Sequence, residues 1–230
     1  MGDLERSYKG RLDSSLEPET TALVIVDMQY HDAHPDHGFC LGMERVSPGS
    51  MAYYNQRLEK TTVPSIRSLL ALFRSNDLKV VYLLLGSEYR DYRDLYPRYR
   101  EWQLQFEQDC GIREMLWNGS PLYQVRDEIA PKAGDVIIMK KTFGAFASTD
   151  LEQRLRIMGI KSLVITGVTT SACPETTARE AADRGLTAVM VDEALCDTRE
   201  ETHDASLKCF SAVFGDVMMD CEAVRTALSI

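Results

Sequence analysis

Residues 163–185, LVITGVTTSACPETTAREAADRG, decide the fold class of this 230-residue chain. The first four, LVIT, are a short apolar run without polar alternation, which is typical of a strand buried on both faces. A helix is predicted for residues 174–184, because Pro174 suits the first helical position and Gly185 suits the C-terminal cap. The segment therefore predicts a strand, a loop and a helix in succession, the repeating unit of an α/β sheet.

The same alternation recurs along the rest of the chain. Four more apolar runs predict buried strands, at residues 21–26, 80–85, 136–139 and 188–191. Apolar spacing and capping residues predict further helices over residues 55–75, from Leu151 to a stop at Gly159, and from near His203. This order predicts a doubly wound, Rossmann-like α/β fold, a parallel sheet flanked by helices, in which ligands bind at the carboxyl ends of the strands.

Length and composition indicate one domain, residues 1–230, with residues 1–19 as an N-terminal extension before the first strand. The chain has 26 basic and 35 acidic residues, a net charge of −9, and so lacks the basic character of proteins that bind nucleic acid or anionic membranes. No apolar run approaches the ~20 residues that a membrane span needs. We therefore expect neither nucleic acid nor a membrane as a partner.

The N-terminus is charged and has no apolar core, which argues against a secretory signal. Arg6 stands where a myristoylation pattern at Gly2 would require Ser or Thr, so the expected location is the cytoplasm. The six cysteines form no C-x-x-C pair, and neither structural zinc nor a disulfide framework is expected. The remaining question is whether one of them is a nucleophile.

Three residues capable of catalysis are expected at the carboxyl edge of the sheet. Cys173 precedes a helix, whose dipole lowers the pKa of a thiol and whose free N–H groups can stabilise an oxyanion. Asp27 ends the first strand and can take the thiol proton, while Lys140 follows the 136–139 strand and can hold both groups ionised. Taken singly, each has a simpler interpretation: a structural cysteine, a loop or capping aspartate, and a solvated lysine.

Three segments together resemble the isochorismatase-like cysteine hydrolases, in particular the branch of the N-carbamoylsarcosine amidase and the ureide (biuret-type) amidohydrolases. They are TALVIVDMQ with Asp27 and Gln29, GDVIIMKKTFGAFASTDLEQRLR with Lys140 and Phe146, and GIKSLVITGVTTSACPETTAREAADRG with Cys173. The resemblance covers about residues 20–215. It implies an isochorismatase-like hydrolase fold with a six-stranded parallel sheet, a catalytic triad of Asp27, Lys140 and Cys173, and a homo-oligomer, either a dimer or a tetramer.

The resemblance also implies a mechanism without a cofactor. A cis peptide bond between Val168 and Thr169 would aim the N–H of Thr169, together with that of Cys173, at the oxyanion. Asp27 would take the thiol proton, the thiolate would attack an amide or ureido carbonyl, ammonia would leave, and water would hydrolyse the covalent intermediate. The expected activity is hydrolysis of a carbon–nitrogen bond in a small linear amide, N-carbamoyl compound or ureide.

The chain departs from the family pattern at positions that bear on the substrate. Pro174 follows the nucleophile where the family has a small apolar residue, and Asp32 stands where many members have Phe. Arg199 lies one position from where the family often has an arginine that anchors a substrate carboxylate. The candidates for substrate contact are Gln29, Tyr89, Phe146 and Arg199.

Other features favour less specific roles. His31, His34 and His37 have a spacing that suggests a metal site, but a proline and a glycine in the same loop prevent one helix face from aligning them. We therefore expect a loop that covers the substrate, and no metal. The basic and aromatic run at residues 89–102 is offset by acids, so it is expected to line the pocket, meet a partner subunit or form a surface helix. His203 is interpreted as structural.

Two other functions stay open at this point. Vinyl-ether hydrolysis of isochorismate does not require a thiol, so activity that survives replacement of Cys173 would indicate it. A non-enzymatic interaction module on the same fold would be favoured by loss of a triad residue, and all three triad residues are present.

Overall fold

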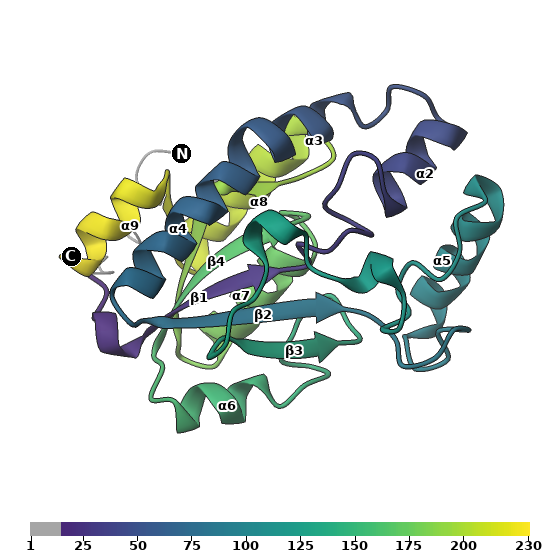
Figure 1. Cartoon of the computed structure of the whole chain (residues 1–230). Coiled ribbons are helices and arrows are strands. Elements are labelled where there is room, and N and C mark those ends of the chain that lie inside the picture. The colour runs from purple at the N-terminus through teal and green to yellow at the C-terminus, as the bar shows by residue number, and fades with distance from the viewer. Residues whose placement is uncertain (1–14) are drawn as a thin grey trace.

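Six parallel strands form one sheet in the middle of the computed structural model, which describes residues 15–230 (Figure 1). They are β1 (Thr21–Val26), β2 (Lys79–Leu85), β3 (Val136–Lys140), β4 (Ser162–Val168), β5 (Thr187–Cys196) and β6 (Asp216–Met218). Their order is β3-β2-β1-β4-β5-β6, and every neighbouring pair is parallel. The doubly wound α/β fold expected from the sequence is therefore confirmed.

Five of these strands coincide with the apolar runs of the sequence, whereas β6 does not. It has only three residues and begins with an acidic one, so it produces no apolar run. Its pairing with β5, from Asp216 opposite Val189 to Met218 opposite Val191, gives it strand conformation. Tertiary pairing, which the local sequence does not reveal, completes the sheet at this edge.

Helices and single turns connect the strands. The α-helices are α2 (Gly38–Val46), α3 (Ala52–Arg57), α4 (Val63–Ser75), α5 (Pro97–Cys110), α6 (Leu151–Ile157), α7 (Cys173–Asp183), α8 (Glu200–Val213) and α9 (Cys221–Leu228). The 3-10 turns are η1 (Pro18–Thr20), η3 (Pro121–Tyr123) and η4 (Asp127–Ile129). The helix expected over residues 55–75 consists of α3 and α4 joined by a π-helical segment, η2 (Leu58–Thr62).

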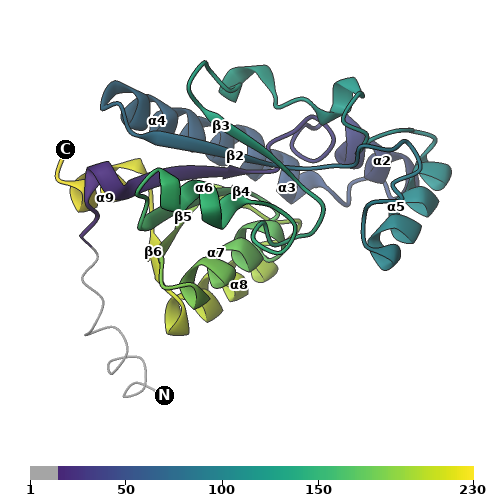
Figure 2. The same cartoon turned by 90° about the horizontal axis from the view of Figure 1, so that it is seen from below.

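The helices cover both faces of the sheet (Figure 2). Helices α4 and α9 pack on one face, and α6, α7 and α8 pack on the other. Successive residues of β1 point to opposite faces, so Leu23 and Ile25 join the first core cluster while Ala22 and Val24 join the second. All residues of β1 are buried, as a parallel strand covered on both faces requires.

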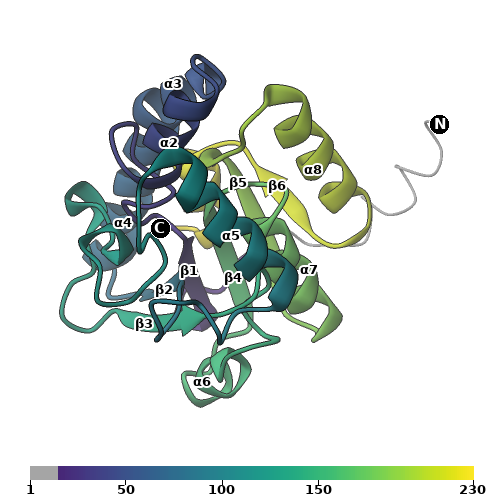
Figure 3. The ribbon, with the colours of Figure 1, turned by 90° about the vertical axis from the view of Figure 1, so that its right-hand side faces the viewer.

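The strand order reverses between β1 and β4, which lie next to each other and are followed by helices on opposite faces. In doubly wound sheets a crevice opens at this point, beyond the carboxyl ends of the strands. Figure 3 looks onto these ends, where α5 crosses in front of the sheet with α2 beside it. Neither α2 nor α5 was predicted from the sequence, and α5 contains part of the mixed basic and aromatic run.

The first described residues already belong to the packed structure. Leu16 is buried in the core, and its backbone N–H donates to the carbonyl of Ala227 over 2.9 Å. The expectations about a signal segment and about Gly2 concern residues 1–14, which lie outside the described residues. Across residues 15–230, no helix is both long and apolar enough to cross a bilayer.

Candidate active site

Asp27 is the first residue after β1, and its backbone is held in an unusual conformation. Its φ angle is 53°, in the left-handed region that aspartate adopts more readily than most residues. Its N–H donates to the carbonyl of Leu83 over 2.9 Å, and its Oδ1 accepts the N–H of Leu85 over 2.8 Å. The neighbouring strand thus fixes the carboxylate at the carboxyl edge of the sheet.

Lys140, the last residue of β3, reaches the same carboxylate. Its Nζ lies 2.9 Å from Asp27 Oδ2 and donates to the carbonyl of Thr142 over 3.2 Å. Both charged side chains are fully buried. Burial alone would lower the pKa of Lys140, but the Asp27 carboxylate and the Cys173 thiol raise it above its ordinary value. Burial raises the pKa of Asp27, and Lys140 only partly opposes this, so the aspartate is a stronger base than usual.

Cys173 is the first residue of α7, and its thiol interacts with both Asp27 and Lys140. The expectation that the helix N-terminus lowers the pKa of this thiol is wrong in direction. Burial raises that pKa well above its ordinary value, and the adjacent Asp27 carboxylate raises it further. The unliganded site therefore holds a neutral thiol beside a strong base, and the thiol must lose its proton to Asp27 to become a nucleophile.

The loop between β4 and α7 carries the expected oxyanion donors. The peptide bond between Val168 and Thr169 is cis. The N–H groups of Thr170 and Ser171 are used within the protein, by the carbonyl of Cys196 and the carboxylate of Asp197. Within the described residues, the N–H groups of Thr169 and Cys173 have no protein acceptor. These two donors are therefore free for a ligand beside the thiol.

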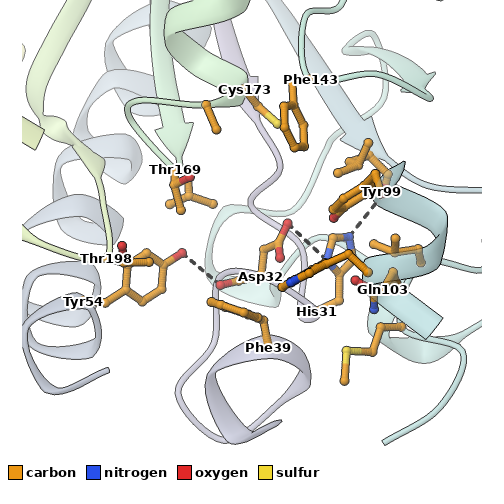
Figure 4. Close-up of a pocket in the computed structure, with 16 residues that line it drawn as sticks. His31, Asp32, Phe39, Tyr54, Tyr99, Gln103, Phe143, Thr169, Cys173 and Thr198 are labelled. Carbon is orange, nitrogen blue, oxygen red and sulfur yellow. Dashed lines mark hydrogen bonds and ion pairs between the residues drawn. The ribbon is translucent and has the colours of Figure 1, made fainter. Parts of the chain in front are cut away.

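A cavity of about 170 Å³ opens above the thiol of Cys173. Figure 4 shows aromatic side chains around it, with Cys173 on one side and His31 and Asp32 on another. Its aromatic lining comes from Phe39, Tyr54, Tyr99, Trp102 and Phe143. Within the described residues, the lining includes no lysine or arginine. The volume is close to that of a cavity that holds benzene, so the site suits a small molecule.

The structure places the four expected substrate contacts outside this lining. Gln29 is buried, and its amide donates to the carbonyls of Tyr123 (2.8 Å) and Leu85 (3.3 Å). Tyr89 is exposed beneath the guanidinium of Arg93, and Phe146 packs in the core below Arg184. Arg199 is exposed just before α8, although its neighbour Thr198 lines the cavity.

The aromatic and acidic lining residues were not selected from the sequence. Phe39 lies on α2, Tyr54 on α3, and Tyr99 and Trp102 on α5, so no local motif joins them. Among these residues, only Asp32 could have been selected from the sequence as a lining residue, because it departs from the family pattern, where many members have Phe. The run at residues 89–102 does reach the pocket, through the two α5 aromatics at its end.

The three histidines of the first loop do not converge on one point. His34 and His37 contact each other, Nδ1 to Nδ1, over 2.8 Å, and both rings pack near Tyr30. His31 is buried away from them, with its ring between Asp32 and the carbonyl of Leu85. Within residues 15–230, no group of three or more histidine, cysteine, aspartate or glutamate side chains is arranged to hold a metal ion.

His203 supports the loop that carries the cis peptide bond. Its Nδ1 lies 2.8 Å from the Thr170 hydroxyl, and its Nε2 lies 2.9 Å from an Arg57 nitrogen and 3.2 Å from Asp192 Oδ1. Arg57 and Asp192 form an ion pair over 2.7 Å. These contacts tie α8, α3 and β5 to Thr170, which is consistent with the structural interpretation of His203.

Comparison with known proteins identifies the family. Residues 21–220 match the family model described as the isochorismatase domain. The chain belongs to the isochorismatase family. This match confirms the resemblance drawn from the three sequence segments, and the fold of the family agrees with the six-stranded sheet and its flanking helices.

Three named proteins are similar to this chain in sequence or in structure. It is 26% identical over 187 residues to the ureidoacrylate amidohydrolase RutB of Rhizobium rhizogenes, covering 78% of this chain and 72% of that protein. The crystal structure of a cysteine hydrolase from Pseudomonas syringae pv. phaseolicola superposes with a TM-score of 0.77 and 25% identity, covering 95% of this chain and 96% of that one. The N-carbamoylsarcosine amidase of Thermoplasma acidophilum has a TM-score of 0.64 and 25% identity, covering 88% and 97%.

These relatives confirm the expected branch of the isochorismatase family and the expected enzyme class. The named amidohydrolase and amidase are hydrolases of carbon–nitrogen bonds outside peptides.

Proposed function

We propose that this protein is a cysteine-dependent amidohydrolase that releases ammonia from a small linear amide, N-carbamoyl compound or ureide. The observation that carries the proposal is the contact of Cys173 with the buried pair of Asp27 and Lys140, together with the position of Cys173 in the lining of one small cavity. The names of the relatives, ureidoacrylate amidohydrolase and N-carbamoylsarcosine amidase, support the choice of bond.

In the first half of the reaction, Asp27 takes the proton of the Cys173 thiol as the sulfur attacks the carbonyl carbon. The carbonyl oxygen becomes an oxyanion that accepts the free N–H groups of Thr169 and Cys173. The tetrahedral adduct then collapses, the carbon–nitrogen bond breaks, and Asp27 returns its proton to the departing ammonia. The raised pKa of Asp27 suits both proton transfers, and Lys140 stabilises the ionised carboxylate before the first transfer and after the second.

In the second half, water hydrolyses the acyl-enzyme thioester, or the thiocarbamate when the substrate is a ureide. Asp27 takes a proton from water as its oxygen attacks the carbonyl carbon, and the same two N–H groups hold the second oxyanion. The carbon–sulfur bond then breaks, the sulfur recovers its proton from Asp27, and the acid product leaves. Every proton is accounted for by Asp27, so the cycle needs no further acid or base.

The test is replacement of the nucleophile. We expect Cys173→Ser to reduce ammonia release from an active amide or ureide by at least about 1,000-fold, because the attacking group is lost. Intact-mass spectrometry of the wild-type protein, quenched during turnover, should show a covalent adduct that the variant lacks.

The matched control is Cys209→Ser, which makes the same change at an exposed cysteine on α8. Its activity should equal that of the wild type. Undiminished ammonia release by Cys173→Ser would overturn the proposed mechanism, and vinyl-ether hydrolysis that survives the substitution would favour the isochorismatase reaction instead.

We also propose that the protein is a homo-oligomer, as the family resemblance implies. Sedimentation equilibrium should give a mass that is a multiple of the 26.0 kDa chain. A single-chain mass at concentrations that support activity would contradict this.

A further inference from the structure

The cavity lining contains one acidic side chain that the proposed reaction does not use. Asp32 lines the cavity, and its side chain is 27% exposed although its neighbour His31 is buried. Figure 4 shows its carboxylate facing the space inside the cavity, across from Cys173. The backbone of Asp32 is fixed, because its carbonyl accepts the Tyr54 hydroxyl over 2.9 Å. A buried backbone thus holds a carboxylate towards the substrate.

The ring of His31 orients this carboxylate. His31 Nε2 lies 3.2 Å from the carbonyl of Leu85, and Nδ1 lies 3.2 Å from Asp32 Oδ2. Both neighbours are acceptors, and a neutral imidazole has only one N–H, so the doubly protonated ring is the form that can donate to both. Burial alone would lower the pKa of His31, but the Asp32 carboxylate raises it above its ordinary value, in agreement with this geometry.

His31 occupies only one of the two carboxylate oxygens. Within the described residues, no side chain or backbone N–H donates to Asp32 Oδ1. Because a carboxylate accepts several hydrogen bonds, Oδ1 is available to a donor on the substrate. The donor would lie in the same small cavity as the carbonyl carbon that Cys173 attacks.

The walls around Asp32 suit a cation rather than an anion. Tyr99 and Trp102 stack with ring centroids 5.8 Å apart, and Phe39 packs against Trp102. Aromatic faces attract ammonium and guanidinium groups through their electron-rich surfaces. A substrate carboxylate, by contrast, would find no lysine or arginine in the described lining, and the His31 ring there is already paired with Asp32.

We propose that the cavity selects amides or ureides that carry a primary ammonium group, which donates to Asp32 Oδ1 while their carbonyl lies against Cys173. This inference rests on the proposed amide hydrolysis and adds its substrate class. The proposed substrate is cationic, whereas the relative in Rhizobium rhizogenes is named for ureidoacrylate, which carries a carboxylate. The cavity volume of about 170 Å³ restricts the spacer between the ammonium and the amide to a few methylene groups.

Three amides of matched length test the proposal. They are β-alaninamide, which is cationic, butyramide, its neutral isostere, and succinamate, which is anionic. We expect kcat/KM for ammonia release to be at least about tenfold higher for β-alaninamide than for butyramide, and lowest for succinamate. Homologues with one and three methylene groups identify the spacer. The same or greater activity on butyramide or succinamate would overturn the proposal.

The residue assignment is tested with Asp32→Asn, which keeps the shape and removes the charge. The ratio of kcat/KM for β-alaninamide over butyramide should fall towards one. A general structural defect would lower both rates and leave the ratio unchanged, and that result would overturn the role of Asp32. The control is Asp36→Asn, the same change at an exposed position of the same loop, which should keep the wild-type ratio.

Binding to the Cys173→Ala variant separates this inference from the proposed reaction. Calorimetric titration with β-alaninamide and butyramide measures selectivity without turnover. Tighter binding of the cation with no hydrolysis by the wild type would support the cation site and contradict the amidohydrolase. Hydrolysis without any preference for the cation would support the amidohydrolase and contradict the cation site.

Discussion

The opposite charges of Asp27 and Lys140 offset the free-energy cost of burying both side chains at this site. Asp27 and Lys140 are fully buried, and an isolated ion in such a place is strongly unfavourable. Each is held by its partner and by backbone groups, through the Leu85 N–H for the aspartate and the Thr142 carbonyl for the lysine. Burial and the adjacent Asp27 carboxylate raise the pKa of Cys173, so its thiol stays neutral until a substrate is attacked.

Asp27→Asn should abolish most of the activity and also destabilise the protein. An amide cannot accept the thiol proton, so we expect kcat to fall by about 100- to 10,000-fold. The substitution also leaves the Lys140 ammonium buried without its counter-ion, which lowers the free energy of unfolding by about 3 kcal/mol. Ammonia release and urea unfolding measure the two effects.

The control for that variant is Asp150→Asn, at the start of α6, where the carboxylate is about half exposed and pairs with Arg154. It should change neither activity nor the free energy of unfolding by much, because water screens exposed ion pairs. Full activity in Asp27→Asn would exclude it as the base.

Two histidines of one loop should respond to pH with opposite signs. The pKa of His31 is raised in the folded protein, so its protonation adds stability that is present below the unfolded value and lost as pH rises through the folded one. The pKa of His34 is lowered by burial and by His37, so its contribution is present above the unfolded value and lost as pH falls towards the folded one.

The measurement is urea unfolding of His31→Gln and His34→Gln at pH values of about 5.5 and 8.5, on either side of the ordinary histidine pKa. The destabilisation caused by His31→Gln should be larger at the lower pH, and that caused by His34→Gln should be smaller there. The same pH trend in both variants would contradict the assignment of His31 as the doubly protonated ring.

At the scale of elements, the loop between β1 and α2 is held by a side chain far away in the sequence. Arg126 is almost completely buried, and its Nη1 donates to the carbonyl of Ala33 over 2.9 Å. The guanidinium also pairs with Glu59 and Glu128, each over 2.7 Å. These contacts connect the loop that carries His31 and Asp32 to the segments on either side of it.

Arg126→Met should therefore cost both stability and selectivity. Loss of the buried guanidinium breaks several charged hydrogen bonds, and we expect a destabilisation of about 3 kcal/mol in urea unfolding. The loosened loop should raise KM more than it lowers kcat. The control is Arg154→Met, at an exposed arginine paired with Asp150 on α6, which should leave the stability almost unchanged because water screens this pair. Equal effects in the two variants would contradict this role for Arg126.

The approach of β4 to β1 depends on a glycine. Gly167 has a φ of 108°, and a Cβ there would lie 2.0 Å from the carbonyl oxygen of Val26, the residue before Asp27. Gly167→Ala should therefore destabilise the protein by more than about 3 kcal/mol and displace the base, lowering kcat. Gly185→Ala is the control, since Gly185 also has positive φ but a Cβ there would meet nothing within 4 Å. It should cost only about 1–2 kcal/mol, and similar values for the two would contradict the steric argument.

At the scale of the whole molecule, one sheet joins two main core clusters, and smaller clusters lie beyond its carboxyl edge. Phe39 and Met43 pack against both the cluster around α4 and the cluster that includes Phe106 of α5. Tyr99 packs against both the cluster around α7 and the one that includes Tyr92. These shared residues connect the pocket region to the sheet.

We therefore predict that the chain unfolds as a single domain. Both tryptophans, Trp102 and Trp117, lie in the pocket region, whereas far-UV circular dichroism reports on the sheet and all helices. The two signals should give coincident urea transitions. Earlier loss of the tryptophan signal would show that the region around α5 unfolds separately. A Trp117→Phe variant assigns the signal to Trp102.

Much of the fold and of the triad could be predicted, because both depend on local sequence. Buried parallel strands require short apolar runs, and the residues that follow those runs, Asp27, Lys140 and Cys173, stand where such a sheet places ligands. The elements that were not predicted are β6, α2, α5 and α9; β6 is too short to form an apolar run, and α5 is only weakly amphipathic. The direction of the pKa shift of Cys173 was predicted wrongly, because burial, its largest cause, is a property of the packed structure.

The sequence by itself determined the doubly wound sheet, its family and the identity of the expected triad, since periodicity and motif residues are local in the chain. Only the tertiary structure decided what surrounds the thiol. The cavity wall combines Asp32, Tyr54, Tyr99 and Trp102 from separate loops and helices, while Arg199 and Tyr89 are exposed to solvent. The physical reason is that substrate recognition depends on distances between segments that are far apart in the chain, and only packing sets those distances.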